Sequence, residues 1–302
     1  MKLTDLIKIG KETISILYPE REAGEMVFAY LEEVIGTKRH THIVEPEYDV
    51  APEKAEIILR DFNRMAAGEP LQYIIGKAWF YGRQFHVTSD VLIPRPETEV
   101  LCNAVIHKYG TFKSPRVLDM CTGSGCIAWT LALEMPSAEV MAVDISDGAL
   151  KVATTQDFAE ETSHKGAQSP KFIKADVLQS PDVCSEISSA AFSNDEQCKF
   201  DIIVSNPPYV MDKEKALMRT NVLDHEPHLA LFVPDDDPLI FYQAVACWAN
   251  KLLKKGGYGI VEINEALGEQ TADVFRQAGF ANVAVIKDLS ERDRFVEFTR
   301  IN

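Results

Sequence analysis

The chain has 302 residues, of which 46% are apolar and 25% charged, and its formal net charge is −15. The length suits one large domain or two modest ones, and the composition is that of a globular protein. The negative charge argues against a nucleic-acid-binding protein, because phosphate contacts need clustered Lys and Arg, and it favours a protein partner with a basic surface. No stretch is long and apolar enough to span a bilayer, and a signal-peptide pattern is absent, so we expect a cytoplasmic protein. The cysteines and histidines form no recognisable metal motif, so we expect no metal site.

Residues 1–75 are predicted to form a small, all-helical domain. Apolar residues recur there at helical spacing, for example between Met26 and Leu31, and Gly68 with Pro70 marks the end of the last helix. We interpret the apolar stripes as a core and not as a binding groove. The segment contains no pattern typical of catalysis.

Residues 76–93 are predicted to form a β-hairpin that links two domains. The stretch from Trp79 to Val87 is rich in aromatic and β-branched residues and has Gly82 near its middle, which is typical of two strands and a turn. A helix is expected to follow, with Pro96 in its first turn.

The rest of the chain, residues 94–302, alternates apolar strands with helical stretches. Strands are predicted at 116–119, 139–144, 171–176, 200–205, 257–263, 282–287 and 293–299, and helices at 126–134, 146–159, 239–254 and 267–278. The polar segments 161–170 and 178–199 are predicted to be loops. The alternation predicts an α/β domain with a doubly wound, mostly parallel, seven-stranded sheet.

A glycine-containing turn joins the first of these strands to its helix. Gly123 and Gly125 would let the backbone pass close to a ligand, because a Cβ atom there would collide with it. The helix that follows offers unpaired N–H groups in its first turn. A tight turn without a ligand is the alternative. The candidate cofactor-binding residues of this segment are Asp119, Cys121, Thr122, Gly123, Ser124 and Gly125.

Two further strands also end in an aspartate. Asp144 ends the second strand, where its carboxylate can accept both ribose hydroxyls of a bound nucleoside. Asp176, followed by Val177, ends the third strand and could face an adenine. Ligands of open α/β sheets bind at the carboxyl edge of the strands, so these residues predict a nucleoside site at that edge.

Spacing alone leaves two cofactors open. Gly123, Gly125 and Ala128 also match the G-x-G-x-x-A pattern of NAD-binding enzymes. Asp119 at the strand end would repel a pyrophosphate, whereas the ammonium group of S-adenosylmethionine would be held by that carboxylate or by nearby carbonyls. Charge therefore favours S-adenosylmethionine, with S-adenosyl-L-homocysteine as the product, over NAD.

The segment Asn206-Pro207-Pro208-Tyr209 follows an apolar strand and stops it abruptly. Two prolines remove two N–H donors, so the loop presents two acceptors, the Asn206 side-chain oxygen and the Pro207 carbonyl. Two neighbouring acceptors match the two N–H groups of a planar –NH2, and Tyr209 could stack on the flat group. The loop is therefore predicted to bind and orient a planar nitrogen for methyl transfer, with Asn206, Pro207 and Tyr209 as the catalytic residues. All four residues of the segment, Pro208 included, are predicted to bind the substrate, and Asn206 is also predicted to contact the cofactor. A Pro-rich turn without a ligand is the alternative.

With these motifs, the chain resembles the release factor glutamine methyltransferases, the protein-(glutamine-N5) methyltransferases, over essentially its whole length. The segment Pro-Arg-Pro-x-Thr-Glu together with Asn-Pro-Pro-Tyr is highly specific. The residues that carry the resemblance are Pro70-Leu71-Gln72-Tyr73-Ile74-Ile75-Gly76, Leu92-Ile93-Pro94-Arg95-Pro96-Glu97-Thr98-Glu99, the segment 119–125, Asn206-Pro207-Pro208-Tyr209, Glu226-Pro227 with Ala230-Leu231, and Lys287-Asp288-Leu289 with Arg294.

The resemblance implies a helical substrate-recognition domain (1–75), a hairpin linker (76–93) and an S-adenosylmethionine-dependent methyltransferase domain (94–302). It implies as substrate the Gln of the Gly-Gly-Gln motif of peptide chain release factors. It also implies roles for single residues. Asp144 would bind the cofactor ribose, Val177 would lie by the adenine, Asn206 with Pro207 would hold the Gln amide, and Arg95 and Thr98 would lie beside the methionine part of the cofactor. We expect a monomer.

Some positions depart from the family pattern. Cys121 stands where Gly is common, and we predict that the turn is built without a positive φ at that residue. Asn264 also stands where Gly is usual, and residues 233–238, 290 and 291 differ as well. These departures concern the geometry of loops more than the chemistry.

Three other functions fit part of the sequence. A DNA adenine or RNA base methyltransferase would use the same Asn-Pro-Pro-Tyr segment on an exocyclic amine, but the chain lacks a basic recognition domain. A methyltransferase-like scaffold that only binds would not need both Asn206 and Asp144. An NAD oxidoreductase is the most distant alternative.

Overall fold

The computed structural model describes residues 1–184, 187, 199–288 and 290–301. It divides the chain into two compact units, and each is described by itself. Unit 1 comprises residues 1–77 together with 218–226, and unit 2 comprises residues 78–217 and 227–302. The chain thus leaves unit 2 after residue 217 and returns to it at residue 227.

Unit 1 is helical, as predicted for residues 1–75. Its core lies between α1, α2 and α4, where Leu6, Tyr30 and Phe62 are almost fully buried. Gly10 on α1 allows a close approach, because a Cβ atom there would lie 2.7 Å from the Phe62 ring. The helices are α1 (Leu3–Ile14), α2 (Glu20–Ile35), α3 (Thr41–Val44), α4 (Pro52–Ala66), α5 (Leu71–Ile75) and α11 (Thr220–Leu223).

A two-stranded hairpin, β1 (Lys77–Phe80) with β2 (Arg83–His86), follows α5. Phe80 and Phe85 are fully buried in unit 2. The guanidinium of Arg83 pairs with Glu161 at 2.6 Å and also with Glu134. These ion pairs attach the hairpin to the helices that carry the two glutamates.

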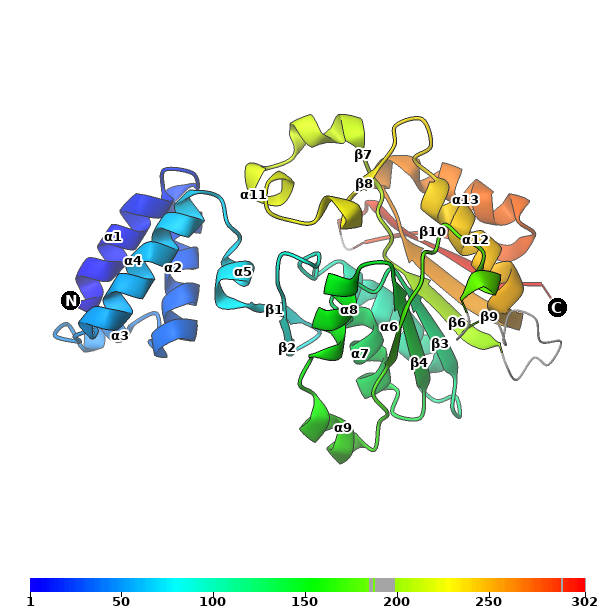
Figure 1. Ribbon diagram of the computed structural model, residues 1–302, viewed down its shortest axis with the longest axis horizontal. Coiled ribbons are helices and arrows are strands. Elements are labelled where there is room, and N and C mark those ends of the chain that lie inside the picture. Colours follow the sequence, from blue (N-terminus) through cyan, green and yellow to red (C-terminus); the bar gives the residue numbers. More distant parts are fainter. Residues whose placement is uncertain (185–186, 188–198, 289, 302) are drawn as a thin grey trace. The chain divides into compact units, whose positions relative to one another are not determined.

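The centre of unit 2 is a seven-stranded sheet of order β10-β11-β9-β6-β3-β4-β5 (Figure 1). The five strands from β9 to β5 are parallel, and β11 runs antiparallel to both β9 and β10. The fold prediction of a doubly wound, mostly parallel sheet is confirmed. The strands are β3 (Arg116–Met120), β4 (Glu139–Asp144), β5 (Lys171–Lys174), β6 (Phe200–Ser205), β9 (Leu253–Glu262), β10 (Phe280–Lys287) and β11 (Asp293–Arg300).

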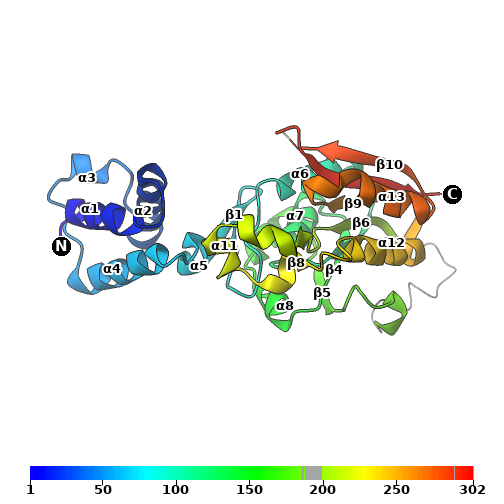
Figure 2. The same cartoon turned by 90° about the horizontal axis from the view of Figure 1, so that it is seen from above.

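Helices cover both faces of this sheet, and Figure 2 shows the same elements from above. Successive residues of β3 alternate between the two cores: Val117 packs with α6 and α7, and Leu118 packs with α12 and α13. The helix α7 is buried over eight of its nine residues, which explains its lack of a polar face. The helices of unit 2 are α6 (Thr98–Tyr109), α7 (Cys126–Glu134), α8 (Asp147–Thr154), α9 (Ala159–Lys165), α12 (Ile240–Leu252) and α13 (Gly268–Gln277).

Short elements complete unit 2. A second small sheet pairs β7 with β8 in parallel. The remaining elements are β7 (Val210–Met211), β8 (Phe232–Val233) and the 3-10 turns η1 (Pro181–Val183), η3 (Asp212–Leu217), η4 (His228–Ala230) and η5 (Glu265–Leu267).

Three local predictions are wrong. The helix predicted at 146–159 is interrupted, because α8 ends at Thr154 and α9 begins at Ala159. The segment 161–170 was expected to be a loop, but α9 extends through Lys165, where Glu161 is held by Arg83 and Lys165. The helix α6 begins at Thr98, so Pro96 precedes it and does not lie in its first turn. Most of the predicted loop 178–199 lies outside the described residues. Among the described residues, no helix has the length and apolar character needed to cross a membrane.

Candidate active site

The candidate site is a cavity of unit 2 at the carboxyl ends of the central strands. The strand order changes direction between β3 and β6, and such a switch point is where open α/β sheets bind ligands. The register pairs Met120 with both Val143 and Ser205, so the segments that follow β3, β4 and β6 begin side by side. The Ser205 hydroxyl also donates to the Met120 carbonyl at 2.7 Å.

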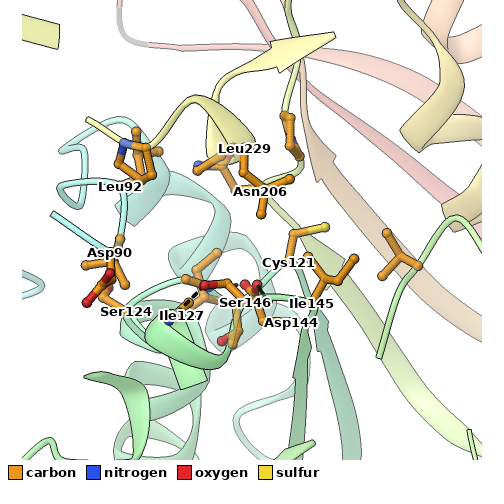
Figure 3. A pocket seen from close by; sticks show the side chains of 18 of the residues that line it. Asp90, Leu92, Cys121, Ser124, Ile127, Asp144, Ile145, Ser146, Asn206 and Leu229 are labelled. Atoms are coloured by element: carbon orange, nitrogen blue, oxygen red, sulfur yellow. Dashed lines mark hydrogen bonds between the residues drawn. The ribbon is translucent and has the colours of Figure 1, made fainter. Parts of the chain in front are cut away.

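Most of the predicted site residues line this cavity. Figure 3 shows Asn206 and Leu229 on one side of it and Asp144 with Ser146 on the other. Four predicted residues do not line it, namely Asp119, Gly125, Pro207 and Tyr209. The predicted residues that do line it are Arg95, Thr98, Cys121, Thr122, Gly123, Ser124, Asp144, Asp176, Val177, Asn206 and Pro208.

The loop of residues 121–125 is built by backbone conformation. Cys121, Gly123 and Gly125 have φ angles of 61°, 55° and 79°, all in the left-handed region. The prediction of a turn without positive φ at Cys121 is therefore wrong. The conformation is imposed by the anchors on either side of this residue: Met120 is held in β3, and the Thr122 N–H donates to the Val143 carbonyl at 3.0 Å.

Gly125 is required for packing as well as for φ. A Cβ atom there would lie 3.1 Å from the Ala153 Cβ and 3.2 Å from the Phe172 ring. At Gly123, by contrast, a Cβ atom would meet nothing within 4 Å. The loop is therefore tight against the protein at Gly125 and open at Gly123.

Asp144 is held by the loop and by the start of the next helix. Its carboxylate accepts from the Gly123 N–H at 2.8 Å and from the Ser146 N–H at 2.9 Å, one bond to each oxygen. Burial raises the pKa of Asp144, and these backbone donors oppose that shift. The Ile145 backbone N–H is a third donor to this carboxylate, so one of the four acceptor positions of its two oxygens remains for a ribose hydroxyl. The Gly123 N–H that would contact a pyrophosphate in an NAD site is already bonded to a carboxylate.

Asp119 lies beneath the loop and is fully buried. Thr122 donates to one of its oxygens at 2.6 Å, and within the described residues the other oxygen has no hydrogen-bond partner. Burial raises the pKa of Asp119 to about 7. Its position indicates that Asp119 supports the loop from behind, through Thr122.

The Asn-Pro-Pro-Tyr segment borders the cavity through Asn206 and Pro208. Tyr209 instead turns into the protein, where its hydroxyl donates to Glu262 at 3.0 Å. Burial raises the pKa of Tyr209, and the neighbouring Glu262 carboxylate adds to the shift.

Two residues that the sequence analysis did not select hold this segment. Glu262 ends β9 and accepts from the Thr98 hydroxyl at 2.7 Å as well as from Tyr209. Asn264 donates to the Tyr209 carbonyl at 3.1 Å and to Glu214 at 2.8 Å. An acidic residue at the end of an apolar strand, the pattern that selected Asp144, would have found Glu262.

The cavity has further lining residues that the sequence patterns did not predict. Most are apolar, which suits the flat and apolar parts of a nucleoside ligand. They are Asp90, Val91, Leu92, Pro94, Cys126, Ile127, Ile145, Ser146, Ala149, Ala175, Leu178, Pro227, Leu229, Ala230 and Phe241.

Family models cover most of the chain. A methyltransferase-domain model matches residues 112–296, and a PrmC N-terminal domain model matches residues 15–76. Among solved structures, the hMettl16 catalytic domain in complex with a 3′UTR hairpin has a TM-score of 0.52 at 15% identity, over 73% of this chain and 76% of that chain. That likeness concerns the fold alone.

Two relatives match over nearly their whole length. The release factor glutamine methyltransferase of Flavobacterium psychrophilum is 35% identical over 292 residues, which cover 95% of this chain and 95% of that protein. The release factor glutamine methyltransferase of Bacteroides thetaiotaomicron is also 35% identical, over 96% of this chain and 97% of that protein. By this similarity the chain belongs to the release factor glutamine methyltransferase family.

Proposed function

We propose that the chain transfers a methyl group from S-adenosylmethionine to the side-chain amide nitrogen of the Gln in the Gly-Gly-Gln motif of a peptide chain release factor. The observation that carries this proposal is the position of Asn206 across the cavity from Asp144. A residue suited to orient a planar nitrogen thereby borders the same cavity as a carboxylate suited to bind a ribose. Membership of the family supports the glutamine substrate.

S-adenosylmethionine supplies a methyl group made electrophilic by a positively charged sulfur. Asp144 is the proposed ribose ligand, because it lines the cavity and its carboxylate keeps an acceptor position beyond its three backbone donors. Asp176 and Val177 are proposed to lie by the adenine, and Arg95 by the methionine part. The loop of residues 121–125 is proposed to shape the cavity around the cofactor.

Asn206 and Pro207 are the proposed ligands of the glutamine amide. The Asn206 Nδ2 donates to the Thr98 hydroxyl at 3.3 Å, which leaves its Oδ1 as an acceptor for one amide N–H. The Pro207 carbonyl is proposed to accept the other N–H, although Pro207 itself lies next to the lining residues Asn206 and Pro208 and does not line the cavity. Holding both hydrogens aims the weakly nucleophilic nitrogen at the methyl group and opposes delocalisation of its lone pair.

The proposal extends to the parts of the chain. Residues 1–75 would recognise the release factor, residues 76–93 would link the domains, and residues 94–302 would carry the chemistry, in keeping with the matched PrmC N-terminal domain. We further propose a monomer that works in the cytoplasm without direct contact with nucleic acid or membrane. The net charge of −15 supports a protein substrate over a phosphate backbone.

A transfer assay tests the substrate. The protein is incubated with methyl-labelled S-adenosylmethionine and a release factor, the same factor with the motif Gln replaced by Ala, or DNA. Label is expected on the unmodified release factor alone. Label on DNA alone, or equal label on the Ala variant, would contradict the proposed glutamine methylation.

A further inference from the structure

A buried chain of hydrogen bonds lies behind Asn206. Glu262 is 1% exposed, and Thr98 is 2% exposed. The register pairs Ser205 of β6 with Val261 of β9, so Asn206 and Glu262 are the next residues of two neighbouring strands. Thr98, the first residue of α6, bridges them, although it is 108 residues from Asn206 and 164 from Glu262 in sequence.

The direction of these bonds follows from the number of hydrogens. A threonine hydroxyl has one hydrogen, and Thr98 donates it to Glu262 at 2.7 Å. Toward Asn206 the hydroxyl oxygen can then only accept. The amide of Asn206 must present its Nδ2 there, as it does at 3.3 Å, because its Oδ1 would meet a second acceptor.

The carboxylate of Glu262 also holds Tyr209, at the other end of the segment of residues 206–209. The Tyr209 hydroxyl donates to the second oxygen of Glu262 at 3.0 Å, and Asn264 donates to the Tyr209 carbonyl at 3.1 Å. Burial raises the pKa of Glu262, and these two hydroxyl donors together with the nearby Arg294 oppose that shift.

We propose that Glu262 and Thr98 are positioning residues that select the orientation of the Asn206 amide and thereby turn its Oδ1 toward the substrate nitrogen. This inference rests on the proposed methyl transfer to an amide. Glu262 does not line the cavity, so it acts through Thr98 and not by contact with a ligand. Without the Glu262 acceptor, the Thr98 hydroxyl is free to donate to Asn206 Oδ1, which reverses the amide and removes the acceptor.

Two substitutions at Thr98 separate orientation from packing. Thr98→Val keeps the shape but has no hydroxyl, whereas Thr98→Ser keeps the hydroxyl and loses a methyl group. We expect Thr98→Val to lower the single-turnover rate at saturating substrates by about a hundredfold, with a much smaller effect on the affinity for S-adenosylmethionine, because its hydroxyl hydrogen is directed at Glu262. Thr98→Ser should restore a rate close to that of the unmodified protein.

A substitution at Glu262 tests the same chain of bonds from its far end. Glu262→Gln offers one acceptor oxygen where two hydroxyl groups donate, so the rate should fall while cofactor affinity is kept. The matched control is Glu297→Gln, because Glu297 also accepts from a tyrosine hydroxyl, that of Tyr258 at 2.9 Å, on a strand away from the segment. The control should leave the rate unchanged. The double variant of Thr98→Val with Glu262→Gln should be slower than Thr98→Val by a smaller factor than Glu262→Gln produces alone, because the part of the Glu262 effect that passes through Thr98 is already lost.

Three results would overturn the inference. A Thr98→Val variant that loses cofactor affinity in proportion to its rate would make Thr98 a cofactor contact. A Thr98→Ser variant as slow as Thr98→Val would assign the effect to the methyl group. Additive effects in the double variant would show that Glu262 does not act through Thr98. These variants are compared only after the unmodified protein has been shown to methylate a release factor. If it does not, the proposed function fails, and that outcome is distinct from a failure of this inference.

Discussion

The loop of residues 121–125 is fixed mainly by its own backbone, whereas residues 206–209 are fixed by buried side chains from distant segments. In the first loop, positive φ angles and N–H groups of residues 122 and 123 make the structure. In the second, Thr98, Glu262 and Asn264 supply the contacts. A proposed cofactor loop whose structure is made by the backbone can therefore accept a side chain such as that of Cys121. The segment proposed to align a substrate depends instead on residues far away in sequence.

The largest effect is expected from Asn206→Ala. Removal of the amide takes away a directed contact to the reacting nitrogen, so turnover should fall by about a thousandfold. Cofactor affinity should stay nearly constant, because the ribose ligand lies across the cavity. Rate and affinity are measured by label transfer and by calorimetry. Asn250→Ala removes an exposed asparagine that donates to the Ala278 carbonyl, and it serves as the control. If Asn206→Ala lowered the affinity for S-adenosylmethionine as much as the rate, Asn206 would be a cofactor ligand. Residues 206–209 would then not differ in role from the loop of residues 121–125.

A second prediction concerns the buried carboxylate beneath the first loop. The folded-state pKa of Asp119 is raised to about 7, above its ordinary value of 3.8, so the folded protein binds the extra proton between these pH values. Its contribution to stability is therefore present at low pH and is lost as the pH rises toward 7. The free energy of unfolding should fall by about 3 kcal/mol between pH 5 and pH 8 relative to Asp119→Asn, which does not titrate. Urea unfolding at several pH values measures it. A constant difference between the two proteins would show that Asp119 is charged throughout and that the loop is not sensitive to this side chain.

The third prediction addresses cofactor binding. Asp144→Asn leaves one acceptor oxygen where two backbone N–H groups donate. The dissociation constant for S-adenosylmethionine should rise by about tenfold to a hundredfold, from the loss of hydrogen bonds to a charged group. The rate at saturating cofactor should change much less. Asp147→Asn, in the same helix region, removes an exposed partner of Lys174 and should bind normally. A lower rate with unchanged affinity for S-adenosylmethionine would show that Asp144 acts in methyl transfer and not in cofactor binding. The proposed division of roles between the two loops would then be wrong.

The smallest effect is expected at Cys121. Its φ of 61° is costly for a side chain, and the cost is greatest for a β-branched one. Cys121→Val should lower the free energy of unfolding by about 2 kcal/mol, whereas Cys121→Gly should stay within about 1 kcal/mol of the unmodified protein. Thermal or urea unfolding of the three proteins checks the order. A Val variant as stable as the Gly variant would show that the backbone of this loop adapts.

The sequence predicted those features of the fold and site that depend on local patterns. All seven strands of the main sheet lie where apolar runs predicted them, and the helix after Gly125 has the predicted bounds of 126–134. The charged segment that forms α9 was missed, because its helix is stabilised by Arg83 from the distant hairpin. The φ of Cys121 was also missed, because the strands that anchor the turn override the preference of a single residue.

The contacts behind Asn206 could not be predicted in the same way. The bond from Thr98 to Glu262 joins positions 164 residues apart, and no periodic pattern relates them. Only the sheet register and the start of α6 bring the two side chains together. The polar residue types were visible, but their pairing is a property of the tertiary structure.

The discontinuity of unit 1 limits how the chain can be divided. Residues 218–226 belong to unit 1, where Arg219 pairs with Glu22 of α2 at 3.0 Å, and the next residue, Pro227, lines the cavity of unit 2. A fragment that starts at residue 78 would keep residues 218–226 but would lose residues 1–77, the rest of the unit to which they belong. Residues 217 and 227, which flank this segment, belong to unit 2. Truncation at the N-terminus is therefore expected to loosen a segment that is joined to Pro227, a lining residue of the cavity. The helical unit is therefore not confined to the N-terminal part of the chain, and a variant without residues 1–77 must also have residues 218–226 redesigned.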